Sequence, residues 1–154
     1  ETKMATITDA VVKTDAIFNF ATQWYYKNPT VSGIPTISDA DFIAFKTFLK
    51  QEKISLDTET NKALKNVLET AKKEKIDTQI TNEYKQLELA IEKYQEMELD
   101  KNKNQIKKLI QEDLITRYQY REGLYQFYTK ENLEIEKAIA LLNNQTQYKS
   151  ILKK

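Results

Sequence analysis

The 154-residue sequence contains no cysteine and no histidine. Without these residues the chain cannot form disulfides, cysteine–histidine zinc sites, thiol nucleophiles or a serine–histidine catalytic triad. It has only two glycines and two prolines, and neither residue type occurs between Pro35 and Gly123. Because a multistranded sheet needs more turn residues than this, we expect an all-α fold.

An excess of charge of one sign and a long apolar run are also missing. The 24 Lys and Arg residues nearly balance 23 Asp and Glu residues, so the net charge of +1 gives no long-range field that would attract nucleic acid or an anionic membrane. No apolar run approaches the roughly 20 residues that a membrane-spanning helix needs. We therefore expect no nucleic-acid partner and no membrane insertion.

A continuous helical repeat covers residues 105–128 and carries the densest aromatic residues of the chain. At 100° per residue, one half of the helix surface is mainly apolar and the other half is polar. The apolar half consists of Ile106, Leu109, Ile110, Leu114, Tyr118, Leu124, Tyr125, Phe127 and Tyr128. The pattern predicts one central helix whose apolar half faces the core.

Asp113, Arg117 and Arg121 interrupt this apolar half at four-residue intervals. Since side chains four apart stack on a helix, we expect one partly buried ion cluster. Two roles fit the pattern. The cluster is structural if the arginine stems pack on tyrosine rings and the guanidinium groups bind Asp113 or a helix-end carbonyl, or it is a docking anchor for a neighbouring domain.

Shorter helical patterns surround the central one. They occupy residues 14–28, 38–52 and 58–75, a segment that begins near Asp77, and a segment capped by Thr129 or Asn132, followed by a last turn from about Thr146. The loop 28–37 holds both prolines, and Ser38 with Asp41 predicts a capping box. We expect an irregular bundle of about five to six helices, in which residues 14–154 form a single domain and residues 1–13 a lead-in from a preceding domain.

The helix that begins near Asp77 carries an apolar stripe, Ile80, Tyr84, Leu87, Ile91 and Tyr94, which suits antiparallel packing in a bundle. Polar residues follow this stripe, and they favour a turn back at residues 100–104 over one very long helix.

An acidic ladder made by Glu88, Glu92, Glu96 and Asp100 lies off this stripe. Carboxylate di-metal sites also need histidines, so we interpret the ladder as a solvated edge that faces lysines such as Lys103 and Lys107. We assign no metal site and no cofactor.

The four serines stand in no nucleophile motif, and Ser38 is explained as a helix cap, so no catalytic residue is assigned. Most of the nine tyrosines and the single tryptophan are expected in the core. Tyr26 and Tyr120 fall near the edges of their apolar arcs, which makes them candidate exposed interface residues.

Five motifs resemble a known family when their order and spacing are taken together. They are residues 15–22 (DAIFNFAT), 37–50 (ISDADFIAFKTFLK), 117–123 (RYQYREG), 135–144 (IEKAIALLNN) and 148–152 (YKSIL). Over residues 8–154 the chain resembles the C-terminal helical region of carboxyl-terminal processing (tail-specific) serine peptidases from one Gram-negative branch. Gln119 stands where the family pattern has a third aromatic residue.

The resemblance implies a parent enzyme with a PDZ module that binds a substrate's C-terminal tail and a peptidase core with a Ser-Lys dyad. Such enzymes are usually exported to the periplasm or cell envelope. None of those motifs lies in these 154 residues, and a chain that begins Glu1-Thr2-Lys3 is either processed or a piece of a longer one. The partners this implies are the peptidase core of the same chain, an adaptor protein or a second copy. The alternative is a freestanding helical adaptor that uses loop 28–37 and exposed tyrosines.

Overall fold

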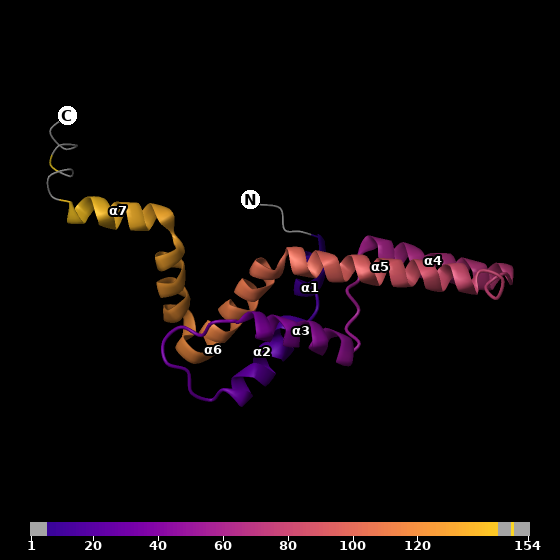
Figure 1. Cartoon of the computed structure of the whole chain (residues 1–154), viewed down its shortest axis with the longest axis horizontal. Helices are drawn as coiled ribbons and strands as arrows, with labels where there is room; N and C mark the ends of the chain where they lie inside the picture. Colours follow the sequence, from indigo (N-terminus) through magenta and orange to yellow (C-terminus); the bar gives the residue numbers. More distant parts are fainter. Residues whose placement is uncertain (1–5, 145–148, 150–154) are drawn as a thin grey trace.

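The structure is a computed structural model that describes residues 6–144 and Lys149. Its elements, in chain order, are α1 (Thr6–Val12), α2 (Ala16–Lys27), α3 (Asp39–Gln51), α4 (Glu59–Glu74), α5 (Thr81–Lys101), α6 (Lys103–Glu131) and α7 (Leu133–Asn143) (Figure 1). The described residues contain no strand, so the all-α prediction is confirmed, with seven helices in place of five or six. The predicted last turn from Thr146 lies outside the described residues, apart from Lys149.

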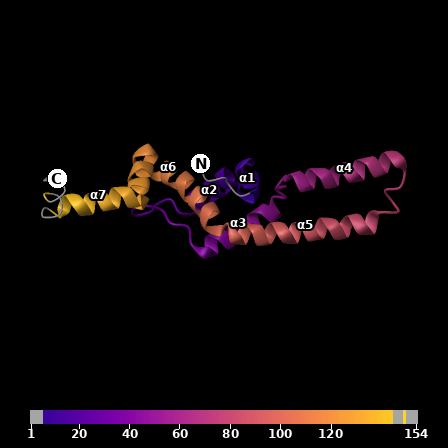
Figure 2. The same cartoon turned by 90° about the horizontal axis from the view of Figure 1, so that it is seen from above.

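The hydrophobic core lies where α1, α2 and α3 meet the end of α5 and the beginning of α6 (Figures 1 and 2). Phenylalanine rings fill its centre, and the rings of Phe20 and Phe45 meet edge to face with their centroids 5.2 Å apart. Leu114 and Ile110 reach the core from α6 and are fully buried. The apolar stripes predicted for α2, α3 and the first part of α6 therefore converge on one interior.

Helix α1 belongs to this core. Ile7, Thr8, Ala10 and Val11 are all buried, because residues three and four apart in α1 present the same face to the neighbouring helices. The boundary predicted at residue 14 therefore does not separate two packing units within the described residues. A domain that precedes this one stays a prediction.

The start of α3 carries the predicted capping box, which the structure confirms. The backbone N–H of Asp41 donates to Ser38 Oγ at 3.1 Å, and the backbone N–H of Ser38 donates to the Asp41 carboxylate at 2.8 Å. The indole Nε1 of Trp24 also donates to Asp41, at 2.9 Å. The carboxylate of Asp41 thus caps α3 directly after the loop 28–37 and also links α3 to α2 through Trp24.

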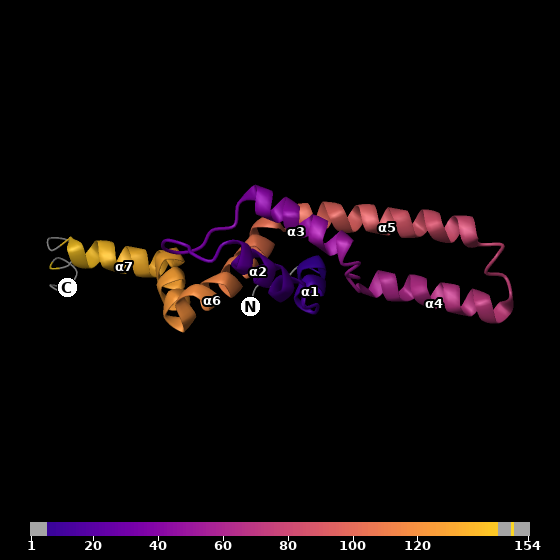
Figure 3. The same cartoon turned by 90° about the horizontal axis from the view of Figure 1, so that it is seen from below.

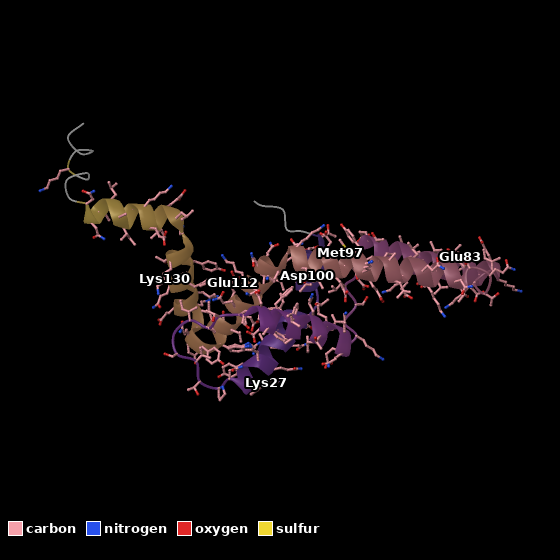
Figure 4. The ribbon with its side chains drawn as sticks, viewed as in Figure 1. Lys27, Glu83, Met97, Asp100, Glu112 and Lys130 are labelled. Carbon is pink, nitrogen blue, oxygen red and sulfur yellow. The ribbon has the colours of Figure 1, made fainter. Side chains whose placement is uncertain are left out.

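Helices α4 and α5 form an antiparallel hairpin that extends away from the core (Figures 1 and 3). Glu83 lies near its tip, whereas Met97 and Asp100 lie near its base (Figure 4). Leu64 and Ala71 of α4 are buried, but Leu87 and Tyr94 of the predicted α5 stripe are 52% and 59% exposed. Since only one helix packs against α5 here, part of the stripe has no cover within the described residues.

Asn102 alone separates α5 from α6. Its backbone N–H donates to the carbonyl of Glu98 at 3.1 Å, and its carbonyl accepts from the N–H of Ile106 at 3.0 Å, so helical hydrogen bonding continues across it. The chain bends at this point but does not reverse (Figure 3). The predicted turn back at residues 100–104 is wrong, because the polar side chains there bind α3: Asp100 pairs with Lys46 at 2.6 Å and Lys103 with Asp39 at 3.0 Å.

The sharpest change of direction occurs inside α6, at Tyr120, which has φ 56° and ψ −157°. Residues 103–119, here called the first arm, and residues 121–131, the second arm, form a V (Figures 1 and 2). Helix α7 continues from the end of the second arm. The straight helix predicted over residues 105–128 is therefore correct only for the first arm.

Candidate functional site

Arg117 lies on the first arm of α6 and makes three contacts. Its Nε donates to the carboxylate of Asp113, one helical turn earlier, and its Nη2 donates to the carbonyl of Phe18 at 3.1 Å. The guanidinium carbon also lies 4.6 Å from the centroid of the Phe18 ring, which is a cation–π distance. Arg117 thus joins α6 to α2 through the hydrogen bond to Phe18 and the stacking on its ring, while the ion pair with Asp113 stays within α6.

This arrangement contains two of the three predicted cluster residues. Asp113 and Arg117 are paired, with their side chains 25% and 20% exposed. Arg121 is exposed and forms no hydrogen bond or ion pair with the described residues. The prediction of one three-residue cluster does not hold for Arg121, because the break at Tyr120 removes it from the four-residue register of the first arm.

An aromatic cluster adjoins this ion pair. The ring of Tyr118 lies 4.8 Å from that of Tyr25 and 6.4 Å from that of Trp24, measured between centroids. The hydroxyl of Tyr118 donates to the backbone carbonyl of Asn28. Desolvation, with a smaller contribution from Tyr25, raises the pKa of the Tyr118 hydroxyl above its usual value near 10, so the hydroxyl remains a donor in the folded protein.

Two glutamines of the first arm hold the loop 28–37. Gln111 donates to the carbonyl of Pro35 at 2.8 Å, and Gln119 donates to the carbonyl of Gly33 at 2.7 Å. Each bond satisfies a loop carbonyl that has no partner in a helix. The sequence carries no signal for these contacts, because glutamines on the polar half of a helix are typically solvated. Gln119, which departs from the aromatic pattern of the resembled family, therefore has a role of its own here.

Tyr26 and Tyr120, the candidate interface residues, are each 77% exposed. Tyr26 rests against the ring of Tyr25, with centroids 5.9 Å apart. The structure is consistent with their choice as exposed residues, but a role in binding stays a prediction. The expectation that most tyrosines lie in the core is wrong, since every described tyrosine is half-buried or exposed. Phenylalanines fill the core instead, because they leave no hydroxyl to be satisfied.

The acidic ladder of α5 faces lysines, although not the predicted ones. Lys50 of α3 pairs with Glu96, Lys46 of α3 pairs with Asp100, and both Lys103 and Lys107 bind Asp39 at 3.0 Å. In the described part of the chain, no group of three or more acidic side chains is placed to hold a metal ion. The last two ladder residues, Glu96 and Asp100, therefore attach the base of the hairpin to α3.

A groove of about 720 Å³ lies at this base, between α3, α4 and α5. Its apolar lining includes Leu49, Leu56, Leu64, Ile91 and Leu99. Positively charged lysines and negatively charged glutamates also line the groove. At one side Gln95 donates a hydrogen bond to the Asn61 side chain at 2.6 Å. Such a mixed lining provides neither a nucleophile beside a base nor a concentration of one charge.

Two of the three described serines, Ser38 and Ser55, form local hydrogen bonds. Ser55 Oγ donates to Asp57 at 2.9 Å, and the amine of Lys65 binds the same carboxylate at 2.9 Å, so the lysine contacts the carboxylate and not the serine. Ser38 serves the capping box. Both hydroxyls therefore donate to carboxylates, Ser38 to Asp41 and Ser55 to Asp57, and Lys65 binds Asp57 instead of activating Ser55, so the described residues form no Ser-Lys pair here.

No helix in the described ranges combines the length and the apolar character needed to cross a membrane.

These features together are those of an all-α domain in which the first arm of α6 carries an arginine–aspartate pair and a ring cluster and holds the loop 28–37. Residues 7–142 match the family described as the C-terminal helical domain of a probable PDZ-protease. Because the match spans most of the chain, the protein belongs to this family, and the resemblance seen in the sequence is confirmed. No curated protein and no solved structure showed a significant match.

Replacing Arg117 with methionine should lower the free energy of unfolding by about 1–2 kcal/mol, because it removes two charged hydrogen bonds and the stacking on Phe18. Urea unfolding followed by Trp24 fluorescence measures this loss. Arg121 is exposed and lies directly after the break at Tyr120, so Arg121→Met should change the free energy of unfolding by less than about 0.5 kcal/mol. An Arg117→Met protein with unchanged stability but lost association with a neighbouring domain would favour docking over the structural role.

Proposed function

We propose that this chain is the non-catalytic C-terminal helical domain of a serine peptidase that carries a PDZ module and processes proteins from their C-terminal tails. The family match over residues 7–142 is the observation that carries the proposal. In this reading the Ser-Lys dyad and the tail-binding groove belong to the rest of the parent chain. The periplasm or cell envelope is the location that such a parent implies.

The exposed apolar side chains of α7 support a structural or docking role. None of its residues is fully buried, and Leu133, Ile139 and Leu142 are exposed. Isolated exposed apolar residues are common on protein surfaces, but Ile139 and Leu142 lie three apart on one helix and form a stripe. The peptidase core of the same chain is our first choice as the partner that covers it, with an adaptor protein or a second copy as the other two.

The non-catalytic part of the proposal is tested with the purified chain. We expect no hydrolysis of an unfolded protein substrate with a free C-terminus above the rate in buffer, because the chain has no histidine and no cysteine, and the described Ser38 and Ser55 bond to carboxylates and not to a lysine amine. Ser38→Ala and Ser55→Ala proteins serve as matched controls. Hydrolysis that disappears in one of these variants would contradict the proposal.

The parent is tested by reading the gene upstream of the codon for Glu1. We expect it to encode a PDZ module followed by a peptidase core with a Ser-Lys pair. An unrelated upstream domain would overturn the assignment. A pull-down with the isolated chain separates it from the alternative of a freestanding adaptor, since the adaptor requires a partner other than its own peptidase core, contacted by exposed residues such as Tyr26 and Tyr120.

A further inference from the structure

Tyr120 adopts a backbone conformation that the local sequence does not favour. Its φ of 56° and ψ of −157° lie close to a region that essentially only glycine occupies, because a Cβ atom collides there with the backbone. The residues around it, Arg117 to Glu122, include neither glycine nor proline, and all of them are tolerated in a helix interior. Considered alone, this segment should continue as a straight helix.

Contacts between the two arms of α6 offset this local preference. Phe127 of the second arm is only 6% exposed, and the amine of Lys108 in the first arm lies 5.5 Å from the ring centroids of both Phe127 and Tyr128. Lys108 and Phe127 are 19 residues apart. In a straight helix they would be separated by roughly 28 Å, so these contacts exist only while α6 is bent.

Gly123 is required by the bent form and not by a straight one. A Cβ atom at this position would lie 2.5 Å from Cβ of Gln119 and 2.9 Å from Cγ2 of Ile115. In a straight helix, residues four apart place their Cβ atoms about 5–6 Å from one another, which leaves room for any side chain. The glycine therefore permits the close approach of the arms just beyond the break.

From these observations we propose that α6 is a two-state element hinged at Tyr120. One state is the V described above. In the other state Tyr120 takes helical angles, residues 103–131 form one continuous helix, and Arg121 returns to the face of Asp113 and Arg117. The change displaces α7 relative to the core formed by α1, α2 and α3. A partner that binds one state more tightly shifts the equilibrium toward that state. This inference concerns conformation and does not depend on the proposed function.

The absence of cysteine makes a distance measurement direct, because two introduced cysteines are the only sites that a thiol-reactive spin label modifies. Asn104 and Lys130 are exposed positions on the first and second arms, and Lys130 is labelled in Figure 4. In a straight helix their Cα atoms would be about 39 Å apart. In the V they are much closer, since the contact of Lys108 with Phe127 lies between them.

Pulsed electron spin resonance on the whole chain should detect a dominant short distance and a minor population near the straight-helix value. Gly123→Ala removes the space at the bend and Phe127→Ala removes the anchor, so each should lower the ratio of the short to the long population at least about tenfold. Tyr120→Gly should remove the long population, because glycine accepts the bent backbone. Tyr125→Ala, at an exposed position of the second arm, is the control that should leave the ratio unchanged.

The proposal is overturned if Gly123→Ala and Phe127→Ala both retain the short-to-long ratio of the unsubstituted chain, or if that chain gives only the straight-helix distance. Circular dichroism confirms that each variant is folded before its distances are measured. Gly123→Ala and Phe127→Ala disturb different contacts, and Tyr120→Gly is expected to shift the ratio in the opposite direction. If one of these variants does not fold, the ratios of the other two are compared with that of the unsubstituted chain.

Discussion

Replacing Phe45 with alanine is expected to lower the free energy of unfolding by about 3–5 kcal/mol, which is the usual cost of deleting a fully buried phenylalanine ring. Phe45 is 0% exposed, and its ring meets that of Phe20 edge to face. Its removal leaves a cavity at the contact of α2 with α3, where neighbouring helices cannot collapse freely. Urea unfolding monitored by Trp24, the single tryptophan, measures the loss.

The matched control is Ile43→Ala on the same helix. Ile43 is 61% exposed, so its truncation removes little buried surface, and alanine is the better helix former. We expect a change within about 0.5 kcal/mol. If Phe45→Ala cost no more than Ile43→Ala, the placement of Phe45 at the centre of the core would be wrong.

Replacing Asp41 with alanine is expected to cost about 2–3 kcal/mol. The change removes the capping box of α3 and leaves the indole N–H of Trp24, half-buried, without its acceptor. Asp39→Ala is the matched control, two residues away. It removes the ion pairs with Lys103 and Lys107, and we expect little change in stability because the Asp39 side chain is 67% exposed and its pairs are screened by solvent.

The stabilisation by Asp41 should depend on pH. Desolvation by itself would raise the pKa of its carboxyl group, but hydrogen bonds from Ser38 and Trp24, with the nearby charge of Lys107, lower it overall. A carboxyl group with a lowered folded-state pKa contributes stability above its unfolded-state pKa, near 3.9, and loses that contribution as the pH falls through the folded-state value. The difference between the original protein and Asp41→Ala should be constant near neutral pH and shrink below about pH 4. A difference that grew with acidification would contradict this sign.

Some parts of the fold follow from nearby residues. Ser38 and Asp41, which form the capping box of α3, are three positions apart, so the sequence alone predicts their hydrogen bonds, and the structure confirms them. Asn132 caps α7 for the same reason, by accepting from the N–H groups of Glu134 and Ile135. For these helix caps, whose partners lie two or three residues further on, prediction from the sequence succeeded.

The ends of α3 and α4 were predicted to within one residue, although the turns after them contain no glycine. Lys53 and Lys75 take left-handed angles, with φ 51° and 60°, at positions where glycine is the common residue. The N–H of Ile76 donates to the carbonyl of Ala71 at 3.0 Å and completes the turn after α4. In this region only the beginning of α5 was predicted too early, near Asp77, whereas α5 begins at Thr81.

The sequence by itself determined that the protein is all-α and that apolar helix stripes form its interior, because helix periodicity and caps are local properties. The order of its motifs along the chain also placed it with the helical domains of PDZ-proteases. The tertiary structure alone decided that α6 bends at Tyr120, that Arg121 leaves the ion cluster and that the acidic ladder meets Lys46 and Lys50. Those outcomes depend on partners such as Lys108 and Phe127, which are distant in the chain. Only the packed structure brings such residues together, and their contacts then outweigh the preference of the local backbone.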